Sequence, residues 1–307
     1  MVVIVTPRSM SRDGHPALSA LEERGWEIRF PARGRRATKE ELTAALGDVD
    51  GYIAGVEPVT AEVLDAAPNL RVISRNGTGV DSIDVAAAES RGVAVRRAEG
   101  ANARGVAELT IGHILSAARF IPLSDAELKG HHWQRRLGSE LYGKTLGLIG
   151  CGKVGRMVAE LALAFGMKVR AYDPYPPEDF RPEGDFELTS LADLLLVSDI
   201  VSLHCPVPAD GSPVLGEQEL PRLKEGAVLV NTARAALVDD AAVAAALDSG
   251  RLSHYTVDAF AEEPPSEWSL IERSNVTATP HIGGYTAESV DRAARAAVEN
   301  LIEELER

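Results

Sequence analysis

The sequence has little cysteine and no apolar run that is long enough to cross a membrane. Its only cysteines are Cys151 and Cys205, and each lies at the end of an apolar run. This placement argues against a disulfide framework and is typical of a protein of the reducing cytoplasm. The most apolar helical stretch, 111–121, is interrupted by His113 and Arg119, so a membrane-spanning helix is not expected.

Basic residues are also in short supply, because 32 lysines and arginines stand against 46 aspartates and glutamates, and the formal net charge is −14. Such a field repels the phosphates of nucleic acids and anionic membranes, so neither is an expected partner. Residues 2–5 already form an apolar run, and the N-terminus lacks the successive regions of a signal peptide. A cytoplasmic globular protein is expected.

Short apolar runs alternate with helical patterns from the first residues onward. With 307 residues, 45% hydrophobic and 25% charged, the chain is expected to form two domains. The first series has predicted strands at 2–5, 27–30, 52–54, 71–74 and 93–95, with predicted helices at 16–24, 39–46, 60–66 and 83–90. This alternation predicts crossover connections and a parallel sheet that is covered on both faces.

A second series of the same kind has predicted strands at 146–150, 168–172, 200–203, 228–231, 255–257 and 276–278. Two doubly wound α/β domains with parallel sheets are therefore predicted. One helical segment over 103–128 lies between the two series. A final helix over 287–306 could pack on either domain.

Three glycines in the second series have the spacing of a dinucleotide-binding fingerprint. Gly150, Gly152 and Gly155 form GCGKVG between a strand-like run at 145–149 and a helical run at 153–165. The first glycine permits a tight turn, the second lets a pyrophosphate approach the backbone, and the third lets helix and strand pack closely. The phosphates would lie at the N-terminus of the helix, where amide donors favour an anion. Both flanks argue against an incidental glycine turn.

An acidic residue at the end of the next strand indicates which dinucleotide is bound. Asp173 lies 18 residues after Gly155, where a carboxylate can accept from both ribose hydroxyls and would repel a 2′-phosphate. NAD is therefore favoured over NADP. Cys151 and Cys205 follow strands that are neighbours in this topology and are expected to lie close together. Passive packing is favoured over a redox role for them.

Seven segments carry a resemblance to a known family. In chain order they are GTGVDSID at 77–84, ANARGVAEL at 101–109, GCGKVG at 150–155, LHCP at 203–206, VNTARAALVD at 230–239, DAFAEEPP at 258–265 and TPHIGG at 279–284. Together they make the sequence resemble the D-isomer-specific 2-hydroxyacid dehydrogenases, in particular the phosphoglycerate dehydrogenase-like members. The resemblance implies a Rossmann NAD-binding domain at 100–285, inserted into a flavodoxin-like substrate domain formed by 1–99 and 286–307. The final helix would then belong to the substrate domain.

The chemistry of such an enzyme needs a cation for the substrate carboxylate and a group that exchanges a proton with the hydroxyl while a hydride moves. The planar guanidinium of Arg234 suits a carboxylate and an adjacent carbonyl oxygen. His281 can accept and donate a proton at physiological pH, and Glu263, if paired with the imidazole, would favour its protonated form. Each of the three could be structural when taken singly. Together they match the arginine, glutamate and histidine of the family and are the predicted catalytic residues.

The resemblance also implies which residues bind the substrate and the cofactor. The predicted substrate-binding loop consists of Asn76, Gly77, Thr78, Gly79 and Val80, to which Arg75 is added as a candidate cation at a strand end. The predicted NAD-binding residues are Asn102, Gly150, Gly152, Lys153, Val154, Gly155, Asp173, His204, Cys205, Pro206, Thr232, Ala233 and Asp258. The expected reaction is reversible hydride transfer between a nicotinamide and C2 of a small 2-hydroxy or 2-keto acid.

The identity of the acid stays open. Hydroxypyruvate or glyoxylate reductase and phosphonate-acid dehydrogenase are alternative activities, and an NAD(H)-sensing, corepressor-like binding protein is an alternative of another class. The loop at 55–58 presents Glu57, which argues against 3-phosphoglycerate. A phosphorylated substrate needs further cations, for which the candidates, or equally solvated surface residues, are Arg8, Arg75, Arg96 and Arg97.

One segment points to self-association. Residues 103–137, with His131, His132 and Trp133, resemble the helix and projecting loop through which members of the family dimerise, so a homodimer is expected. The two histidines have no cysteine or carboxylate at ligand spacing, and no metal is expected.

Overall fold

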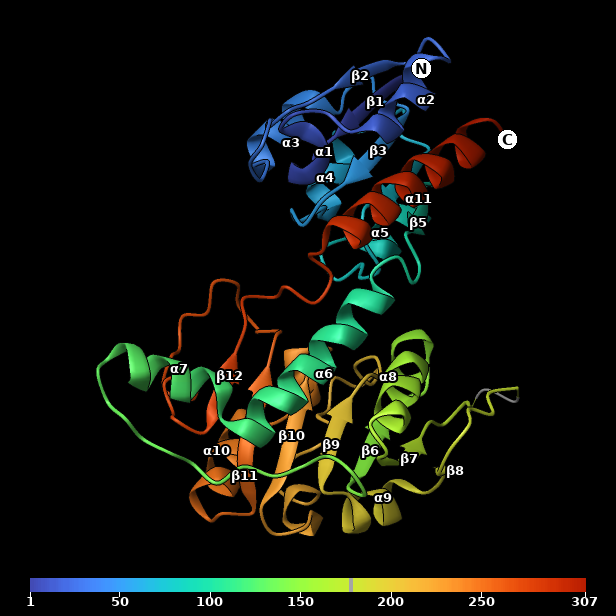
Figure 1. The fold of residues 1–307 in the computed structure, drawn as a ribbon. Coiled ribbons are helices and arrows are strands. Elements are labelled where there is room, and N and C mark those ends of the chain that lie inside the picture. The colour runs from blue at the N-terminus through green and yellow to red at the C-terminus, as the bar shows by residue number, and fades with distance from the viewer. Residues whose placement is uncertain (177–178) are drawn as a thin grey trace. The chain divides into compact units, whose positions relative to one another are not determined.

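The computed structural model describes residues 1–176 and 179–307. The chain divides into two compact units, of which the first contains Met1–Asn102 and Thr286–Arg307 and the second contains Ala103–Tyr285. The sequence placed these divisions after residues 99 and 285. Each unit is built on one parallel sheet with helices on both faces (Figure 1), as the predicted fold class requires.

The sheet of the first unit has the strand order β2-β1-β3-β4-β5. Its strands are β1 (Val2–Val5), β2 (Glu27–Arg29), β3 (Gly51–Ala54), β4 (Val72–Arg75) and β5 (Ala94–Arg97). One face packs on α3 (Lys39–Ala45), α4 (Ala61–Asp65) and α5 (Val85–Ser90). The other face packs on α1 (Arg8–Ser11), η1 (Pro16–Leu18), α2 (Ser19–Glu22) and α11 (Ala287–Leu305). Cover on both faces explains the nearly continuous apolar residues of β1 and β3.

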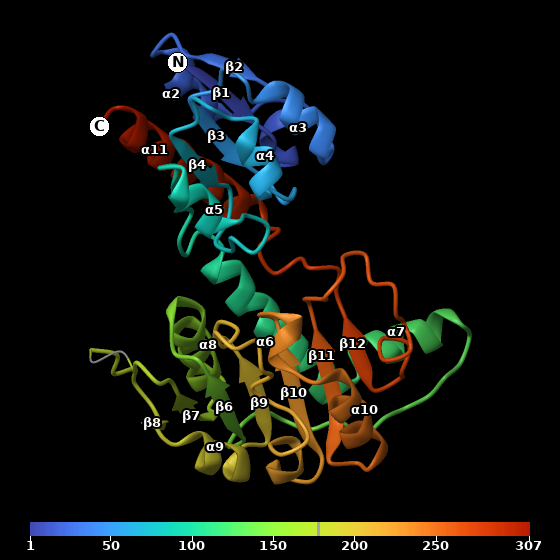
Figure 2. The same ribbon diagram turned by 180° about the vertical axis from the view of Figure 1, so that it is seen from behind.

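The final helix, α11, packs on the first unit. Leu301 and Leu305 lie against Gly51 of β3, where an added Cβ would come within 3.0 Å of both leucine side chains. The hydroxyl of Ser74 in β4 donates to the carbonyl oxygen of Ala297 at 2.7 Å. The N- and C-terminal segments are therefore parts of one core (Figure 2).

The sheet of the second unit has seven parallel strands in the order β12-β11-β10-β9-β6-β7-β8. They are β6 (Thr145–Ile149), β7 (Lys168–Tyr172), β8 (Phe186–Leu188), β9 (Ile200–Leu203), β10 (Ala227–Asn231), β11 (Leu252–Val257) and β12 (Val276–Ala278). One face packs on α6 (Ala103–Arg119) and α8 (Lys153–Ala164). The other packs on α9 (Leu191–Val197), η2 (Leu220–Arg222), η3 (Ala235–Leu237) and α10 (Asp240–Asp248).

The predicted single helix over 103–128 is wrong, because the structure breaks it at Phe120 into α6 and α7 (Ile121–Lys129). Pro122 has no backbone N–H and cannot bond to the carbonyl of Ala118, four residues earlier. That carbonyl accepts the N–H of Ser139 instead, at 2.9 Å, and Phe120 adopts a left-handed φ of 54°. Among the described residues no single helix is long and apolar enough to cross a membrane, although α6 and α7 meet that test when taken together across their 62° bend.

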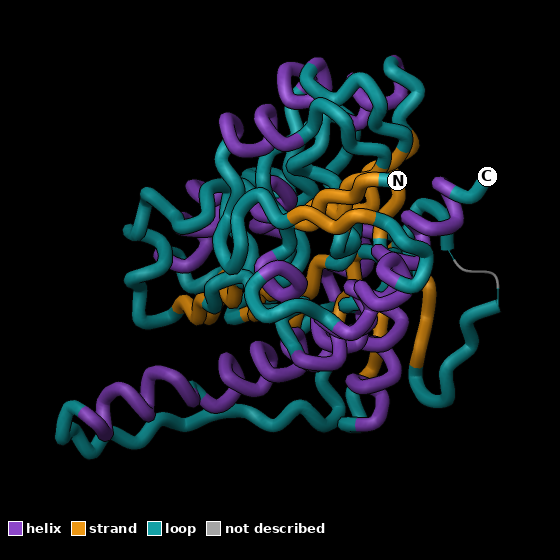
Figure 3. The backbone as a smooth tube through the Cα atoms, turned by 90° about the horizontal axis from the view of Figure 1, so that it is seen from above, coloured by secondary structure: helices purple, strands orange, loops and turns teal. Residues whose placement is uncertain are grey.

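Residues 121–140 form a segment that we name the arm. It consists of α7 and the returning loop, and it runs away from the body of the second unit and back (Figure 3). None of its residues is buried, yet it carries Leu128, Trp133 and Leu137 with exposed fractions of 57%, 83% and 98%.

Candidate active site

The predicted residues of the second unit gather at one edge of its sheet. All seven strands are parallel, so their carboxyl ends share that edge, which is where open α/β sheets bind ligands. The strand order reverses at β6, from which β7 and β8 extend to one side and β9 to β12 to the other. The residues that follow these strands are Gly150 after β6, Asp173 after β7, His204 after β9, Arg234 after β10, Asp258 after β11 and His281 after β12.

The turn between β6 and α8 contains three glycines. Protein atoms fill the space beside two of them, and the space beside the third is empty. Gly150 adopts φ 100°, and a Cβ there would lie 2.6 Å from the backbone nitrogen of Cys205. A Cβ on Gly155 would overlap the carbonyl oxygen of Gly150. Gly152 is the N-cap of α8 and has no other heavy atom within 4 Å of an added Cβ. The open position therefore lies over the first turn of α8.

This arrangement fits the pyrophosphate of a dinucleotide. Lys153 and Val154 begin α8, and the first N–H groups of a helix have no partner within it. Their donors and the helix dipole favour an anion at the space beside Gly152.

The carboxylate of Asp173 accepts two backbone N–H groups, one from the glycine turn and one from the loop that follows β7. Its Oδ2 accepts the N–H of Cys151 at 2.7 Å, and its Oδ1 accepts the N–H of Tyr175 at 2.8 Å. The carboxylate thus orders the glycine turn and its own loop. Because a carboxylate offers about four acceptor positions, capacity for ribose hydroxyls remains.

His204 closes the turn from the side of β9. Its N–H donates to the carbonyl oxygen of Ile149 at 2.7 Å, and its Nε2 lies 2.9 Å from the hydroxyl of Ser202. Desolvation lowers the pKa of His204 to about 3, so the ring is neutral near pH 7. Pro206 follows on the surface of the same loop.

The two cysteines are free thiols that pack in different cores. Cys151 belongs to the core under α6 and α8, whereas Cys205 packs on the core of the opposite face of the sheet. Burial raises the pKa of each thiol to about 11. Passive packing is therefore the better interpretation of both, because the reactive thiolate is disfavoured.

The loop that carries Arg234 is shaped by a buried amide that is not among the predicted site residues. Asn231, the last residue of β10, has no exposed surface. Its Nδ2 donates to the carbonyl oxygen of Arg234 at 2.8 Å, and its Oδ1 accepts the N–H of Ala233 at 3.1 Å. Arg234 is partly exposed, with Nη1 2.8 Å from the carbonyl oxygen of Ala233. The turn of Thr232, Ala233 and Arg234 is thus fixed at its base.

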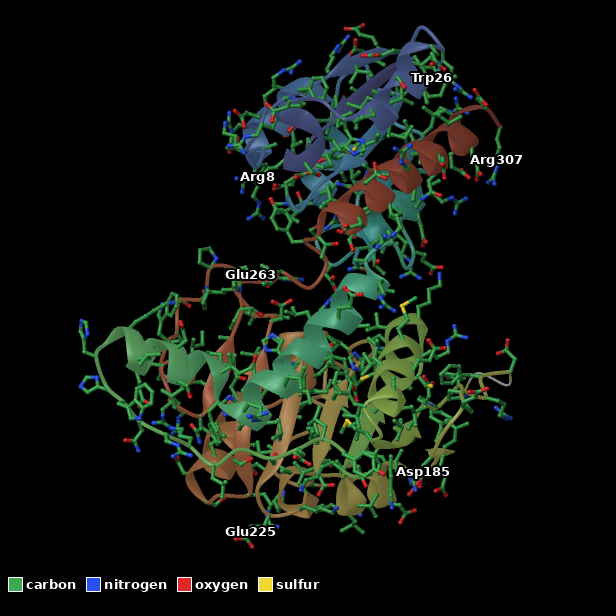
Figure 4. All side chains as sticks on the ribbon, in the orientation of Figure 1. Arg8, Trp26, Asp185, Glu225, Glu263 and Arg307 are labelled. Atoms are coloured by element: carbon green, nitrogen blue, oxygen red, sulfur yellow. The ribbon has the colours of Figure 1, made fainter. Side chains whose placement is uncertain are left out.

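Glu263 and His281 form a hydrogen-bonded pair. Nδ1 of His281 lies 2.6 Å from Oε1 of Glu263, and the side chains are 46% and 43% exposed. Oε1 also accepts the N–H of Phe260, at 3.3 Å. Figure 4 labels Glu263 on the loop between β11 and β12. With Nδ1 engaged, Nε2 is the ring nitrogen that can serve a substrate.

The backbone of His281 is held in an uncommon conformation by Asp258. His281 has φ 51°, a left-handed conformation that costs a residue with a Cβ about 1–2 kcal/mol. Asp258 is 1% exposed and accepts the N–H groups of Ile282 and Gly283, both at 2.8 Å. The hydroxyl of Thr279 donates to the same carboxylate at 2.6 Å. Three donors from one loop therefore offset the local strain.

An apolar pocket of about 400 Å³ adjoins the Glu263–His281 pair. Besides the pair and Thr279, its walls are Phe260, Pro264, Pro265, Trp268, Ile271, Ala278 and Pro280. Such a wall lowers the local dielectric beside the imidazole and limits access of water.

The predicted substrate-binding loop lies in the first unit, after β4. Gly77 has φ 150°, and the guanidinium of Arg75 donates to the carbonyl oxygen of Asn76. The hydroxyl of Thr78 donates to Oδ1 of Asn102 at 2.9 Å. Asn102, predicted to contact NAD, thus contacts the substrate-binding loop; Gly79 and Val80 complete that loop.

Glu57 is not presented by its loop as the sequence suggested, because its side chain is buried. Its carboxylate accepts from the hydroxyl of Tyr52 at 2.6 Å, from the N–H of Gly55 at 2.7 Å and from the hydroxyl of Thr6. These bonds make it a structural residue of the loop at 55–58. Of the other candidate cations, Arg8 donates to the carbonyl oxygen of Gly34, Arg96 pairs with Glu304 at 2.6 Å and Arg97 pairs with Glu99 at 2.9 Å.

No cluster of three or more histidines, cysteines, aspartates or glutamates suited to a metal ion occurs in the described part of the chain. His131 and His132 lie on the exposed arm.

The fold and site define an α/β protein with a dinucleotide-binding glycine turn and a hydrogen-bonded histidine–glutamate pair on the same edge of one sheet. Residues 111–283 match the model of the D-isomer specific 2-hydroxyacid dehydrogenase, NAD binding domain. The chain therefore belongs to the D-isomer specific 2-hydroxyacid dehydrogenase family, and its second unit contains the NAD-binding domain of that family.

Three relatives illustrate this membership. Hydroxypyruvate reductase of Thermotoga maritima is 40% identical over 87% of this chain and 88% of that protein. D-3-phosphoglycerate dehydrogenase of Mycobacterium tuberculosis is also 40% identical, over 86% of this chain but 50% of that protein. The TT0316 protein of Thermus thermophilus has a solved structure with a TM-score of 0.89 and 37% identity, over 100% of this chain and 97% of that one. The chain thus spans about half the length of the phosphoglycerate dehydrogenases that it matches.

Proposed function

We propose that the protein is an NAD-dependent oxidoreductase that interconverts a small 2-hydroxy acid and the corresponding 2-keto acid. The observation that carries the proposal is the Glu263–His281 pair, joined at 2.6 Å on the same sheet edge as the glycine turn after β6. Acid/base catalysis at an alcohol or carbonyl oxygen needs such an imidazole.

In reduction, Nε2 of the protonated His281 ring gives its proton to the carbonyl oxygen of the keto acid. Glu263 stabilises the charged ring through Nδ1 and keeps Nε2 directed outward. Arg234 binds the carboxylate and the adjacent oxygen through its planar guanidinium. In oxidation, the neutral ring takes the hydroxyl proton back at Nε2. The nicotinamide of bound NAD(H) supplies or accepts the hydride at C2.

The order of substrates to test follows from the candidate cations, because the hydroxypyruvate reductase and the phosphoglycerate dehydrogenase are equally similar to this chain, at 40% identity. We propose an unphosphorylated acid, with hydroxypyruvate and glyoxylate as the first candidates and a phosphonate acid after them. Arg96 pairs with Glu304 and Arg97 pairs with Glu99, so a phosphate would have to compete with a carboxylate for each of these cations.

The test is NADH consumption with a panel of 2-keto acids. Turnover is expected with hydroxypyruvate or glyoxylate, and His281→Ala should lower kcat roughly 10²–10⁴-fold. His132→Ala is the matched control, since that histidine is exposed and lies on the arm after α7, outside the predicted site. Wild-type protein that binds NADH but turns over none of the panel would favour the NAD(H)-sensing alternative.

We also propose that the protein is a cytoplasmic homodimer. The arm supports the dimer, because exposed leucines and a tryptophan on a segment without buried residues are typical of a surface that associates. The free thiols of Cys151 and Cys205 suit a reducing compartment.

A further inference from the structure

Two buried histidines of the second unit are not used by the proposed mechanism. His113 of α6 and His254 of β11 are each 3% exposed. Each contacts a threonine hydroxyl near β12: Nε2 of His113 lies 3.0 Å from Thr279, and Nε2 of His254 lies 2.8 Å from Thr277. Thr279 also donates to Asp258, which contacts the loop of His281, and this bond gives His113 a role that His254 lacks.

Thr279 connects His113 to the loop that carries the proton-transferring histidine. The Thr279 hydroxyl has one proton and donates it to Oδ1 of Asp258 at 2.6 Å, so it must accept from Nε2–H of His113. Burial lowers the pKa of His113, which leaves a neutral ring with a single N–H near pH 7. Asp258 in turn accepts the N–H groups of Ile282 and Gly283. Every link has one donor and one acceptor.

The same face of α6 also contacts the loop that carries Arg234. Thr110, three residues before His113, lies on this face of the helix. Its hydroxyl oxygen is 2.8 Å from that of Thr232, and both residues are buried. Val106, one turn earlier, lies 3.3 Å from a Cβ placed on Gly283. One helix face is therefore a common support for both catalytic loops.

We propose that His113 is a positioning residue for His281, acting through Thr279 and Asp258. The proposal rests on the proposed function of His281. Without the His113 N–H, the Thr279 hydroxyl can rotate away from Asp258, and the loop at 279–283 loses part of what offsets the left-handed conformation of His281. The imidazole then leaves its productive position, while Arg234 and the substrate carboxylate are unaffected.

The experiment compares His113→Leu with His254→Leu. Both variants remove a buried imidazole and one bond to a threonine, but only the first interrupts the chain to Asp258. For His113→Leu we expect kcat with the best keto acid to fall roughly 10–100-fold, as for a small displacement of a reacting group, with KM changed less than about threefold. His254→Leu should keep kcat within about threefold, and His113→Gln, which can place an N–H near Nε2, should recover most of the loss.

Equal kcat values for the two leucine variants, at matched thermal unfolding temperatures, would overturn the proposal. If His113→Leu does not fold, Thr279→Val replaces it with Thr277→Val as its control and Thr279→Ser as the variant that keeps the hydroxyl; equal kcat values for the two valine variants would be equally decisive. Failure of the proposed function looks different, since wild-type protein and His254→Leu would then lack turnover as well.

Discussion

Asp173 combines two tasks at the scale of a single residue. It orders the glycine turn through the N–H of Cys151, and its position after β7 suits a ribose hydroxyl. Asp173→Asn keeps an acceptor for the turn but removes the charge that repels a 2′-phosphate. We expect the preference for NADH over NADPH, measured as a ratio of kcat/KM values, to fall roughly tenfold or more.

Asp185→Asn is the control for this prediction. Asp185 pairs with Arg170 at 2.8 Å and precedes β8, so it is a carboxylate at the opposite end of the parallel strands from the glycine turn. An unchanged NADH to NADPH ratio in Asp173→Asn would show that another group sets the cofactor preference.

Which residues the sequence revealed depends on what each residue touches. Arg234, Glu263 and His281 stand out because they are charged or titratable residues in loops that follow apolar strands. Asn231, Thr279 and His113 do not stand out, because each contributes through hydrogen bonds that only the folded chain brings together. For His113 the partner is 166 residues away in the chain. The role of Glu57 was mispredicted for the same reason, since its partner Thr6, which follows β1, is 51 residues away in the chain.

At the scale of elements, two glycines of the turn between β6 and α8 should respond differently to substitution by alanine. One should affect stability and the other NADH binding. Gly155→Ala would place a Cβ into the carbonyl oxygen of Gly150, and such overpacking costs about 1–3 kcal/mol or more of unfolding free energy. Gly152→Ala meets no atom and changes only an N-cap residue, at a cost of at most about 1 kcal/mol. It should still weaken NADH binding, because its methyl group occupies the phosphate space.

Chemical denaturation and NADH fluorescence titration measure the two effects separately. Gly226→Ala, at a turn glycine before β10 with φ 73°, reports the cost of backbone strain away from the glycine turn between β6 and α8. Gly152→Ala that binds NADH as tightly as the wild type would contradict the phosphate site.

Most strands were predictable because a strand that is buried on both faces is a short apolar run, which can be recognised without knowing its neighbours in the sheet. β7, β9 and β12 have the predicted bounds, and α11 ends one residue early. β8 was missed because it is a three-residue edge strand with two exposed positions. The break at Phe120 was missed because the helical periodicity of the sequence continues through Pro122. The hydrogen bond from the N–H of Ser139 to the carbonyl of Ala118, which replaces the helical one, is visible only in the structure.

At the scale of the whole molecule, the second unit is an insertion into the first. The chain leaves the first unit after Asn102 and returns at Thr286, so both termini belong to the unit that carries the loop at 76–80. The Glu263–His281 pair and Arg234 belong to the inserted unit. Neither unit alone therefore contains the full set of predicted site residues.

The arm provides the test of assembly. Leu128 is 57% exposed and Leu137 is 98% exposed, and a lysine at either position would place a charge in an apolar interface, where it is costly to desolvate. We expect the wild type to sediment as a dimer and Leu137→Lys and Leu128→Lys to shift it toward monomer. Leu196→Lys on α9 is the matched control, because Leu196 is 55% exposed but lies outside the arm. Trp133 supplies an independent signal, since its emission should shift to the red when the arm is left in water. A wild type that sediments as a monomer at micromolar concentration, or a dimer that persists in both arm variants, would place the interface elsewhere or remove it.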